Sequence, residues 1–264
     1  QNTTDTAVIR VRNLTMRFGD HLVLDRASFD VFEGEVFVIL GGSGCGKSTL
    51  LRHLVGLNTP FAGTVEVAGE RLDTGDPAAL DRARRRIGVM FQGGALFGSM
   101  TLAHNVALPI LEYTGLDTAS ALELAAMKLA LVNLSGAERL LPSEISGGMR
   151  KRAAIARALA LNPSILFLDE PSAGLDPVTS AELDTLILRL NRELRMTMVL
   201  VTHELPSIFS VAGRVIFLDR VSKTIIAQGP PQELLERGSH PAVQSFFRRQ
   251  PLQALRPQPA VGRC

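Results

Sequence analysis

The sequence predicts an α/β fold, in which a core of short buried strands and helices carries an inserted helical subdomain. Two observations predict it. Short apolar runs, ending in glycines or acids, recur in both halves of the chain, as buried strands do. Between about 102 and 161 these runs give way to helical spacing of the apolar residues. With 264 residues, of which 46% are hydrophobic, the chain is long enough to bury such a core.

The first element is an alternation of apolar and polar residues over 8–30, with a turn at Gly19-Asp20, which is typical of strands. In the inserted region, breaks between helices are expected at Pro109, Gly115, Gly136 and Pro142. Elsewhere the pattern predicts helices over 48–56 and 180–194, and strands over 35–40, 63–69, 87–91, 165–168, 198–201 and 215–218.

Composition excludes several classes of protein. No apolar run reaches the roughly 18 residues that a bilayer span needs, and no signal sequence is visible. Cys45 and Cys264 form neither a disulfide framework nor a metal cluster, which favours a reducing cytoplasm. The net charge is +2, and five arginines without acids gather from Arg237 onward, so a nucleic-acid partner is not expected. That tail is either a solvated terminus or a contact for a partner subunit or lipid headgroups.

A glycine-rich loop stands between a predicted strand and a predicted helix. Residues 41–48 read GGSGCGKS, which satisfies the G-x-x-x-x-G-K-[ST] pattern of a phosphate-binding loop. Lys47 can reach the β- and γ-phosphates, and the Ser48 hydroxyl can bind Mg²⁺. The predicted ATP-binding residues of this loop are Gly41, Gly42, Ser43, Gly44, Cys45, Gly46, Lys47, Ser48 and Thr49.

Two carboxylates follow another predicted buried strand, in ILFLDE at 165–170. The carboxyl ends of strands are where ligands bind in open α/β sheets. We therefore expect Asp169 to lie on the Mg²⁺ side of the site, and Glu170 to orient and deprotonate the attacking water. The alternative is a strand that ends in two solvated acids.

A second helix start with exposed backbone is predicted at 146–149, which reads SGGM. Ser146 is a good N-cap, and Gly147 and Gly148 expose the main chain. One chain cannot easily bring two such helix ends to the same γ-phosphate, whereas a head-to-tail dimer with two ATP at its interface can. The alternative is simply a capped helix.

These motifs together make the chain resemble the nucleotide-binding subunits of ABC transporters over nearly its full length. The resemblance rests on an ordered set of motifs: Walker A (41–48), a Q-loop glutamine (Gln92), a signature (146–149), Walker B (165–170), a D-loop ending SAGLD (172–176) and a switch histidine (His203). It implies a P-loop NTPase with a RecA-like core, an N-terminal antiparallel β-subdomain and the inserted helical subdomain. It further implies a flexible segment at 1–7, an ATPase domain over 8–240 and a C-terminal extension over 241–264.

The resemblance also implies roles for single residues. Phe18 would stack on adenine, and Gln92 would sense Mg²⁺ and the water near the permease contact. His203 would contact the γ-phosphate and help hold the water of Glu170, and Asp176 would cross the dimer interface. The signature, Ser146, Gly147 and Gly148, would close on the partner's ATP. One departure is Met149, because the family usually has glutamine there.

Some segments resemble a narrower group, the ATPases of Mla/Mce-type lipid transporters: FQGGALFGSM (91–100), LPSEISGGM (141–149), DEPSAGLDPVTSAELD (169–184) and THELPSIFSVAGRVIFLD (202–219). This likeness implies a homodimer on the cytoplasmic face of a bacterial inner membrane, bound to an integral-membrane permease. An Mce-domain lipid-binding protein and a small regulatory subunit are further implied partners. Two alternatives stay open, an importer of another solute and an ABC ATPase without a permease.

Overall fold

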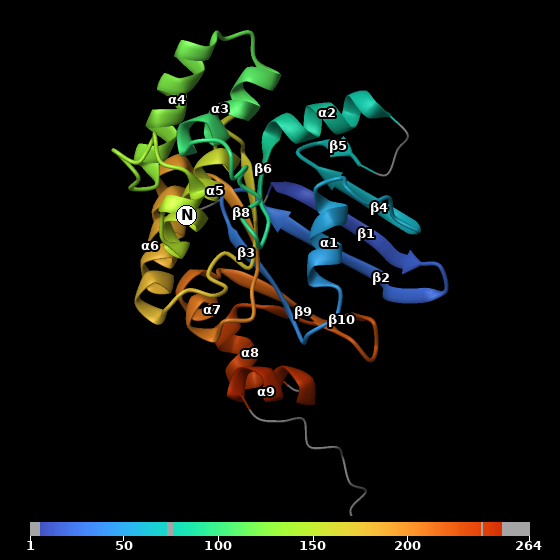
Figure 1. The fold of residues 1–264 in the computed structure, drawn as a ribbon. Coiled ribbons are helices and arrows are strands. Elements are labelled where there is room, and N and C mark those ends of the chain that lie inside the picture. The colour runs from blue at the N-terminus through green and yellow to red at the C-terminus, as the bar shows by residue number, and fades with distance from the viewer. Residues whose placement is uncertain (1–5, 73–75, 239, 250–264) are drawn as a thin grey trace, which may run out of the picture.

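Two β-sheets form the frame of the chain (Figure 1). The structure, a computed structural model, describes residues 6–72, 76–238 and 240–249. Most of the predicted flexible segment 1–7 lies outside these ranges, and the first strand begins at Ala7. In the described ranges, every helix is too short or too polar to cross a membrane.

The larger sheet has six strands, and the strand that leads into the glycine-rich loop lies inside it. Five of its strands run parallel, and the edge strand β10 pairs antiparallel with β9. Their carboxyl ends therefore gather at one edge, where ligands bind in this kind of sheet. In spatial order the strands are β10 (Thr224–Gly229), β9 (Arg214–Asp219), β3 (Val36–Gly41), β8 (Thr197–Val201), β7 (Ile165–Asp169) and β6 (Ile87–Met90).

The smaller sheet is antiparallel, as the N-terminal alternation and the family resemblance predict. The turn between its first two strands falls at Gly19-Asp20, where Phe18 pairs with His21. In spatial order the strands are β2 (His21–Phe32), β1 (Ala7–Phe18), β4 (Ala62–Val67) and β5 (Glu70–Arg71).

Helices cover the larger sheet and build the inserted subdomain, which lies to one side of it (Figure 1). That subdomain holds α3 (Leu102–Tyr113), α4 (Thr118–Leu131), the 3₁₀ turn η1 (Pro142–Glu144) and α5 (Gly147–Ala158). The other helices are α1 (Lys47–Leu54), α2 (Pro77–Arg86), α6 (Pro177–Leu194), α7 (Leu205–Val211), α8 (Pro231–Arg237) and α9 (Pro241–Arg248).

Successive side chains of β3 point into two different cores. Val38 and Leu40 face the larger core, which the helical subdomain shares. Phe37 and Ile39 face the smaller core, between the two sheets. Burial on both faces explains why this strand is an unbroken apolar run, and it fixes the position of the loop that follows.

One expected helix break is wrong. Pro109 lies inside α3, whereas Gly115, Gly136 and Pro142 lie outside the α-helices of the subdomain as expected. A proline removes one helical hydrogen bond. Buried neighbours in the same helix, including Val106 and Ile110, keep α3 packed on the core despite that loss. The short elements α2, β5, β10, α7, α8 and α9 were not anticipated from the sequence pattern.

Candidate functional site

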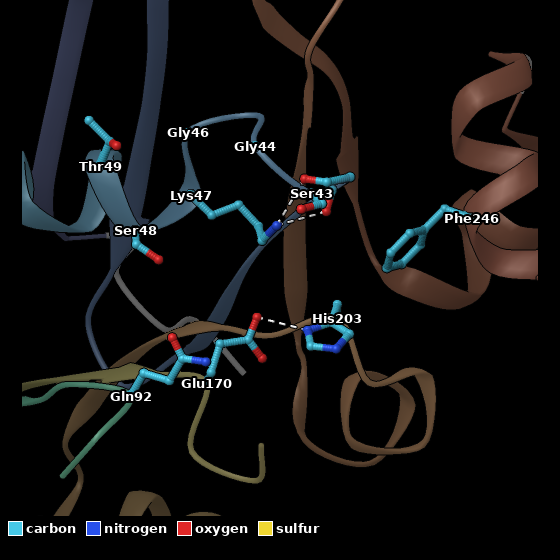
Figure 2. Close-up of a pocket in the computed structure, with 12 residues that line it drawn as sticks. Ser43, Gly44, Gly46, Lys47, Ser48, Thr49, Gln92, Glu170, His203 and Phe246 are labelled. Carbon is cyan, nitrogen blue, oxygen red and sulfur yellow. Dashed lines mark hydrogen bonds and ion pairs between the residues drawn. The ribbon is translucent and has the colours of Figure 1, made fainter. Parts of the chain in front are cut away.

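A cleft of about 490 Å³ opens at the carboxyl ends of the parallel strands. It brings together four of the separate sequence motifs, because β3, β6, β7 and β8 all end there. Figure 2 shows the side chains converging from different strands and loops. The residues that line the cleft are Gly41, Gly42, Ser43, Gly44, Gly46, Lys47, Ser48, Thr49, Gln92, Glu170, His203 and Phe246.

The glycine-rich loop turns directly into α1. Gly46, the N-cap, has φ 98° and no side chain to cap the helix, so the helix start carries bare backbone. A Cβ atom on Gly46 would lie 2.6 Å from Cγ1 of Val23, so this close approach also requires glycine. The Nζ of Lys47 donates hydrogen bonds to the carbonyl oxygens of Gly41 (2.9 Å) and Gly42 (3.0 Å). The loop thus wraps around a cation at the start of a helix, an arrangement suited to phosphate.

Oxygen atoms gather on one side of the cleft. The Ser48 hydroxyl donates a hydrogen bond to Oδ1 of Asp169 at 3.2 Å. Asp169 is buried, and burial raises the pKa of its carboxyl, against the hydrogen bond from Ser48, which lowers it. A buried carboxylate beside a hydroxyl gains from a nearby cation. Among the described residues, no three His, Cys, Asp or Glu side chains cluster as a metal site.

Glu170 occupies an unusual backbone position just beyond β7. Its φ is 49°, in the left-handed region that non-glycine residues seldom adopt. The backbone N–H donates to the carbonyl of Val201 at 2.8 Å, which ties the turn to β8. The side chain is buried, and its Oε2 has no hydrogen-bond partner. A buried carboxylate oxygen without a partner is a candidate base, because buried polar atoms are otherwise nearly always paired.

His203 lies opposite that carboxylate (Figure 2). Its Nδ1 is 2.8 Å from Oε1 of Glu170. An ionised carboxylate can only accept, so Nδ1 carries the proton in this hydrogen bond. The carboxylate is thereby held by one oxygen, while the other has no hydrogen-bond partner. The pair has the arrangement of a base and the group that orients it.

Lys151 is a contributor that the sequence analysis did not single out. It lies on α5, and its Nζ donates to the backbone carbonyls of Gln92 (2.6 Å) and Glu170 (3.2 Å). Burial lowers the pKa of this ammonium, and nearby carboxylates, with Glu170 the strongest, oppose that shift. The lysine ties the helical subdomain to two segments of the cleft. The sequence feature that could have pointed to Lys151 is the basic run RKR at 150–152, directly after the signature.

Two predicted ATP-binding residues do not line this cleft. Phe18 is 53% exposed at the end of β1. The Cys45 side chain is 2% exposed and packs into the smaller core. Burial raises the pKa of its thiol, against the opposing effect of Lys47. Only the backbone of Cys45 therefore remains as a candidate phosphate contact.

The signature and Asp176 also lie away from the cleft that holds the glycine-rich loop. Gly147 lines a second cleft with Gln92, Lys151 and Leu175. Asp176 caps α6, where its Oδ1 accepts from the backbone N–H of Val178 and Thr179, both at 3.0 Å.

Ser146 caps α5, as expected, by accepting from the N–H of Met149 at 3.2 Å. A Cβ on Gly148 would lie 2.6 Å from Cγ2 of Thr179, so the packing of α5 against α6 already requires glycine here. Met149 itself packs against the larger core. Met149, which departs from the family pattern, is therefore partly buried in a packing contact.

Phe246 is the lining residue that the sequence analysis did not anticipate. It lies on α9, within the predicted C-terminal extension 241–264, and points toward the cleft on the side of Ser43 and His203 (Figure 2). The same helix buries Val243 and Phe247 in the larger core. The described part of this extension is therefore packed on the body of the protein.

Comparisons with known proteins agree on one family. The family model described as "ABC transporter" matches residues 24–173. An intermembrane phospholipid transport system ATP-binding protein, MlaF of Haemophilus influenzae, is 38% identical over 87% of this chain and 86% of its own length. MlaF of Escherichia coli is 38% identical over 91% of this chain and 88% of its own. A probable ribonucleotide transport ATP-binding protein, mkl of Mycobacterium leprae, is 41% identical over 90% of this chain and 68% of its own.

Solved structures with the same fold are ATP-binding cassettes. A dimeric post-hydrolysis cassette bound to ADP and phosphate matches with a TM-score of 0.75 and 31% identity, over 84% of this chain and 98% of that one. The cbiO1 protein of Clostridium perfringens, part of the ABC transporter complex cbiONQ, matches with a TM-score of 0.79 and 27% identity, over 88% of this chain and 92% of its own.

Proposed function

Because this chain belongs to the ABC transporter family, as an ATP-hydrolysing subunit, we propose that it powers lipid transport between membranes. The observation that carries the proposal is a single cleft that joins a phosphate-binding loop to the hydrogen-bonded pair of Glu170 and His203. The likeness to MlaF proteins over most of both chains supports the lipid cargo.

Nucleotide binding is assigned to the glycine-rich loop and to Phe18. The backbone of 41–49 and the ammonium of Lys47 would hold the phosphates. The exposed ring of Phe18 would stack on adenine, outside the phosphate cleft. This division explains why Phe18 does not line the cleft that holds the loop.

The oxygen-rich side of the cleft fits Mg²⁺. Ser48, Asp169 and Gln92 offer a hydroxyl, a carboxylate and an amide oxygen. Mg²⁺ prefers such oxygens and completes its shell with substrate phosphates and water, so one carboxylate suffices. When bound, the ion would neutralise charge on the phosphates. Ser48, Asp169 and Gln92 are therefore assigned to hold it.

Glu170 is assigned as the general base. Water attacks the γ-phosphorus, the bond to the bridging oxygen of ADP breaks, and Oε2 of Glu170 accepts the proton of the water. His203 holds Oε1, and the unpaired Oε2 is the oxygen that we assign to the proton of the water. Glu170 has a left-handed backbone conformation, and its side chain lines the cleft; such backbone strain is concentrated at functional sites.

We assign the signature to the ATP of a second copy. Gly147 lines a different cleft from Lys47 within one chain. A head-to-tail homodimer would close each signature helix on the partner's γ-phosphate. Asp176, at the start of α6, would cross the interface. The dimeric cassette among the similar structures supports this arrangement.

The proposed partners follow from the lipid cargo. The dimer would sit on the cytoplasmic face of an inner membrane and bind a permease through the surface that follows Gln92. An Mce-domain lipid-binding protein and a small regulatory subunit complete the proposed assembly. ATP binding would close the dimer, and hydrolysis would reopen it. We also propose that the ATPase domain spans residues 8–240 and that residues 241–264 form a C-terminal extension.

A second candidate is the transport of a different solute. The mycobacterial relatives, named for ribonucleotide transport, are 41% identical to this chain. The same ATP hydrolysis in this cleft would serve the transport of either cargo. The partner protein that binds the cargo distinguishes them.

An affinity purification of this chain from solubilised native membranes, analysed by mass spectrometry, tests the proposal. A multispan permease together with an Mce-domain protein is the expected result. Recovery of a permease with a soluble solute-binding protein would remove the lipid cargo and keep the transporter. Recovery of soluble partners alone would contradict the transporter assignment.

A further inference from the structure

Four phenylalanines form a chain of ring contacts under the cleft. Phe246 of α9 meets Phe217 of β9 edge-on, with ring centroids 5.2 Å apart. It also meets Phe247 of the same helix at 5.5 Å, and Phe247 meets Phe209 of α7 at 5.6 Å. Such edge-on and tilted contacts add stability beyond that of the buried area alone. The rings therefore fasten α9 to β9 and to α7 together.

The two elements that α9 joins are the supports of two catalytic segments. β9 lies beside β3, with Leu218 paired to Gly41 at the start of the phosphate-binding loop. On the other side, α7 begins at Leu205, directly after the segment that carries His203. The ring of Phe246 is thus linked through Phe217 to the strand beside the phosphate-binding loop, and through Phe247 and Phe209 to the helix that follows His203 in the chain.

The side chain of His203 is held by fewer surrounding atoms than that of Glu170. Its side chain is 62% exposed, whereas that of Glu170 is 10% exposed. Within the described part of the chain, its ring makes one hydrogen bond, to Glu170. An exposed ring held by one hydrogen bond retains rotamer freedom. Phe246 lines the same cleft as His203, on the side of Ser43 (Figure 2).

We propose that Phe246 is a positioning residue for ATP hydrolysis, which holds His203 in the orientation that bonds to Glu170. This inference rests on the proposed roles of that pair. It assigns to α9 a part in the chemistry of its own chain. Phe246 acts through His203 and not as a contact for the nucleotide base, which is assigned to Phe18.

The test is steady-state ATP hydrolysis by the full chain with Phe246→Ala. Misplacing a catalytic group lowers turnover more than binding, so kcat should fall about tenfold. KM for ATP should stay within about twofold of the parent value. Phe246→Tyr keeps the ring and should restore most of kcat. If the alanine variant does not fold, Phe246→Leu carries the same test, because it removes the ring and keeps apolar volume.

Two comparisons separate positioning from a general loss of structure. Val243→Ala loosens the buried face of α9 but leaves the Phe246 ring in place. It should lower the melting temperature and leave kcat within about twofold. In a double-mutant cycle with His203→Ala, the second change at Phe246 should lower kcat no further, because coupled residues are not additive.

Several outcomes would overturn the inference. Additive losses in the cycle, an equal loss of kcat in Val243→Ala, or a raised KM with unchanged kcat would each do so. An unchanged kcat in Phe246→Ala would also do so. Failure of the underlying assignment is recognised separately, since Glu170→Gln would then hydrolyse ATP normally.

Discussion

Two helix starts in this chain carry glycines, and they are built differently. α1 starts at Gly46, which has no side chain to cap it, and Lys47 stands in its first turn. α5 starts at Ser146, whose hydroxyl already accepts a backbone N–H at 3.2 Å. Of the two, only the first shares its cleft with the carboxylate of Glu170 and with a histidine. A helix start becomes a complete site through the neighbours that the sheet brings to it.

Under the proposed assignment, the second helix start would become part of a catalytic site only together with another molecule. Its cleft holds Gln92 and Lys151 but neither the loop lysine nor the base. Variants of the first site, of both sites together and of the second site alone should therefore differ in how much hydrolysis they lose.

The largest effect is expected at the complete site, with Glu170→Gln. The amide cannot accept the proton, so hydrolysis should fall by roughly 10²–10⁴. ATP should still bind, and the closed dimer should accumulate. Hydrolysis of radiolabelled ATP and size-exclusion chromatography measure the two effects. Glu193→Gln, at an exposed position of α6, is the matched control. Normal turnover in Glu170→Gln would remove the assigned base.

An intermediate effect should link the two helix starts. Lys47→Ala removes the cation that holds the phosphates. Gly147→Asp adds a negative charge where we propose that the partner's γ-phosphate binds. The space there accepts a side chain, because the nearest atom to a Cβ, in Leu175, is 3.6 Å away. Each variant alone should lose most of its hydrolysis.

A mixture of the two variants should recover activity. In mixed head-to-tail dimers, both defects fall in one site, which leaves the other site intact. The measurement is the hydrolysis rate against the mixing ratio. The control mixture contains wild type and Lys128→Ala, a lysine variant on α4, in place of Lys47→Ala. The absence of recovery in folded, dimer-forming mixtures would contradict a shared site.

The smallest effect should come from Ser146→Ala. Loss of the α5 cap should cost about 1 kcal/mol of stability, or a few degrees in melting temperature. Hydrolysis should also weaken, because the hydroxyl is assigned to the partner's phosphate. Asp117→Ala removes the comparable cap of α4 and should affect only melting. If both variants lose the same hydrolysis, Ser146 acts as a cap and nothing more.

The sequence by itself determined the local chemistry. Residues 41–48 place the glycines, the lysine and the hydroxyl in one consecutive stretch, and 165–170 place two acids at the end of a buried strand. The cap of α5 was also readable, since Ser146 needs only its own helix. In each case the interacting groups lie within a few residues, so backbone periodicity is enough to bring them together.

Only the tertiary structure decided what meets across the fold. The register of β7 and β8 brings His203 to Glu170, although the two are 33 positions apart. Helix packing brings Lys151 to the backbone of Gln92 and places Phe246 at the cleft. The physical reason is that these contacts depend on how elements pack, which no local pattern encodes. The same packing keeps Pro109 inside a helix that its own sequence would interrupt.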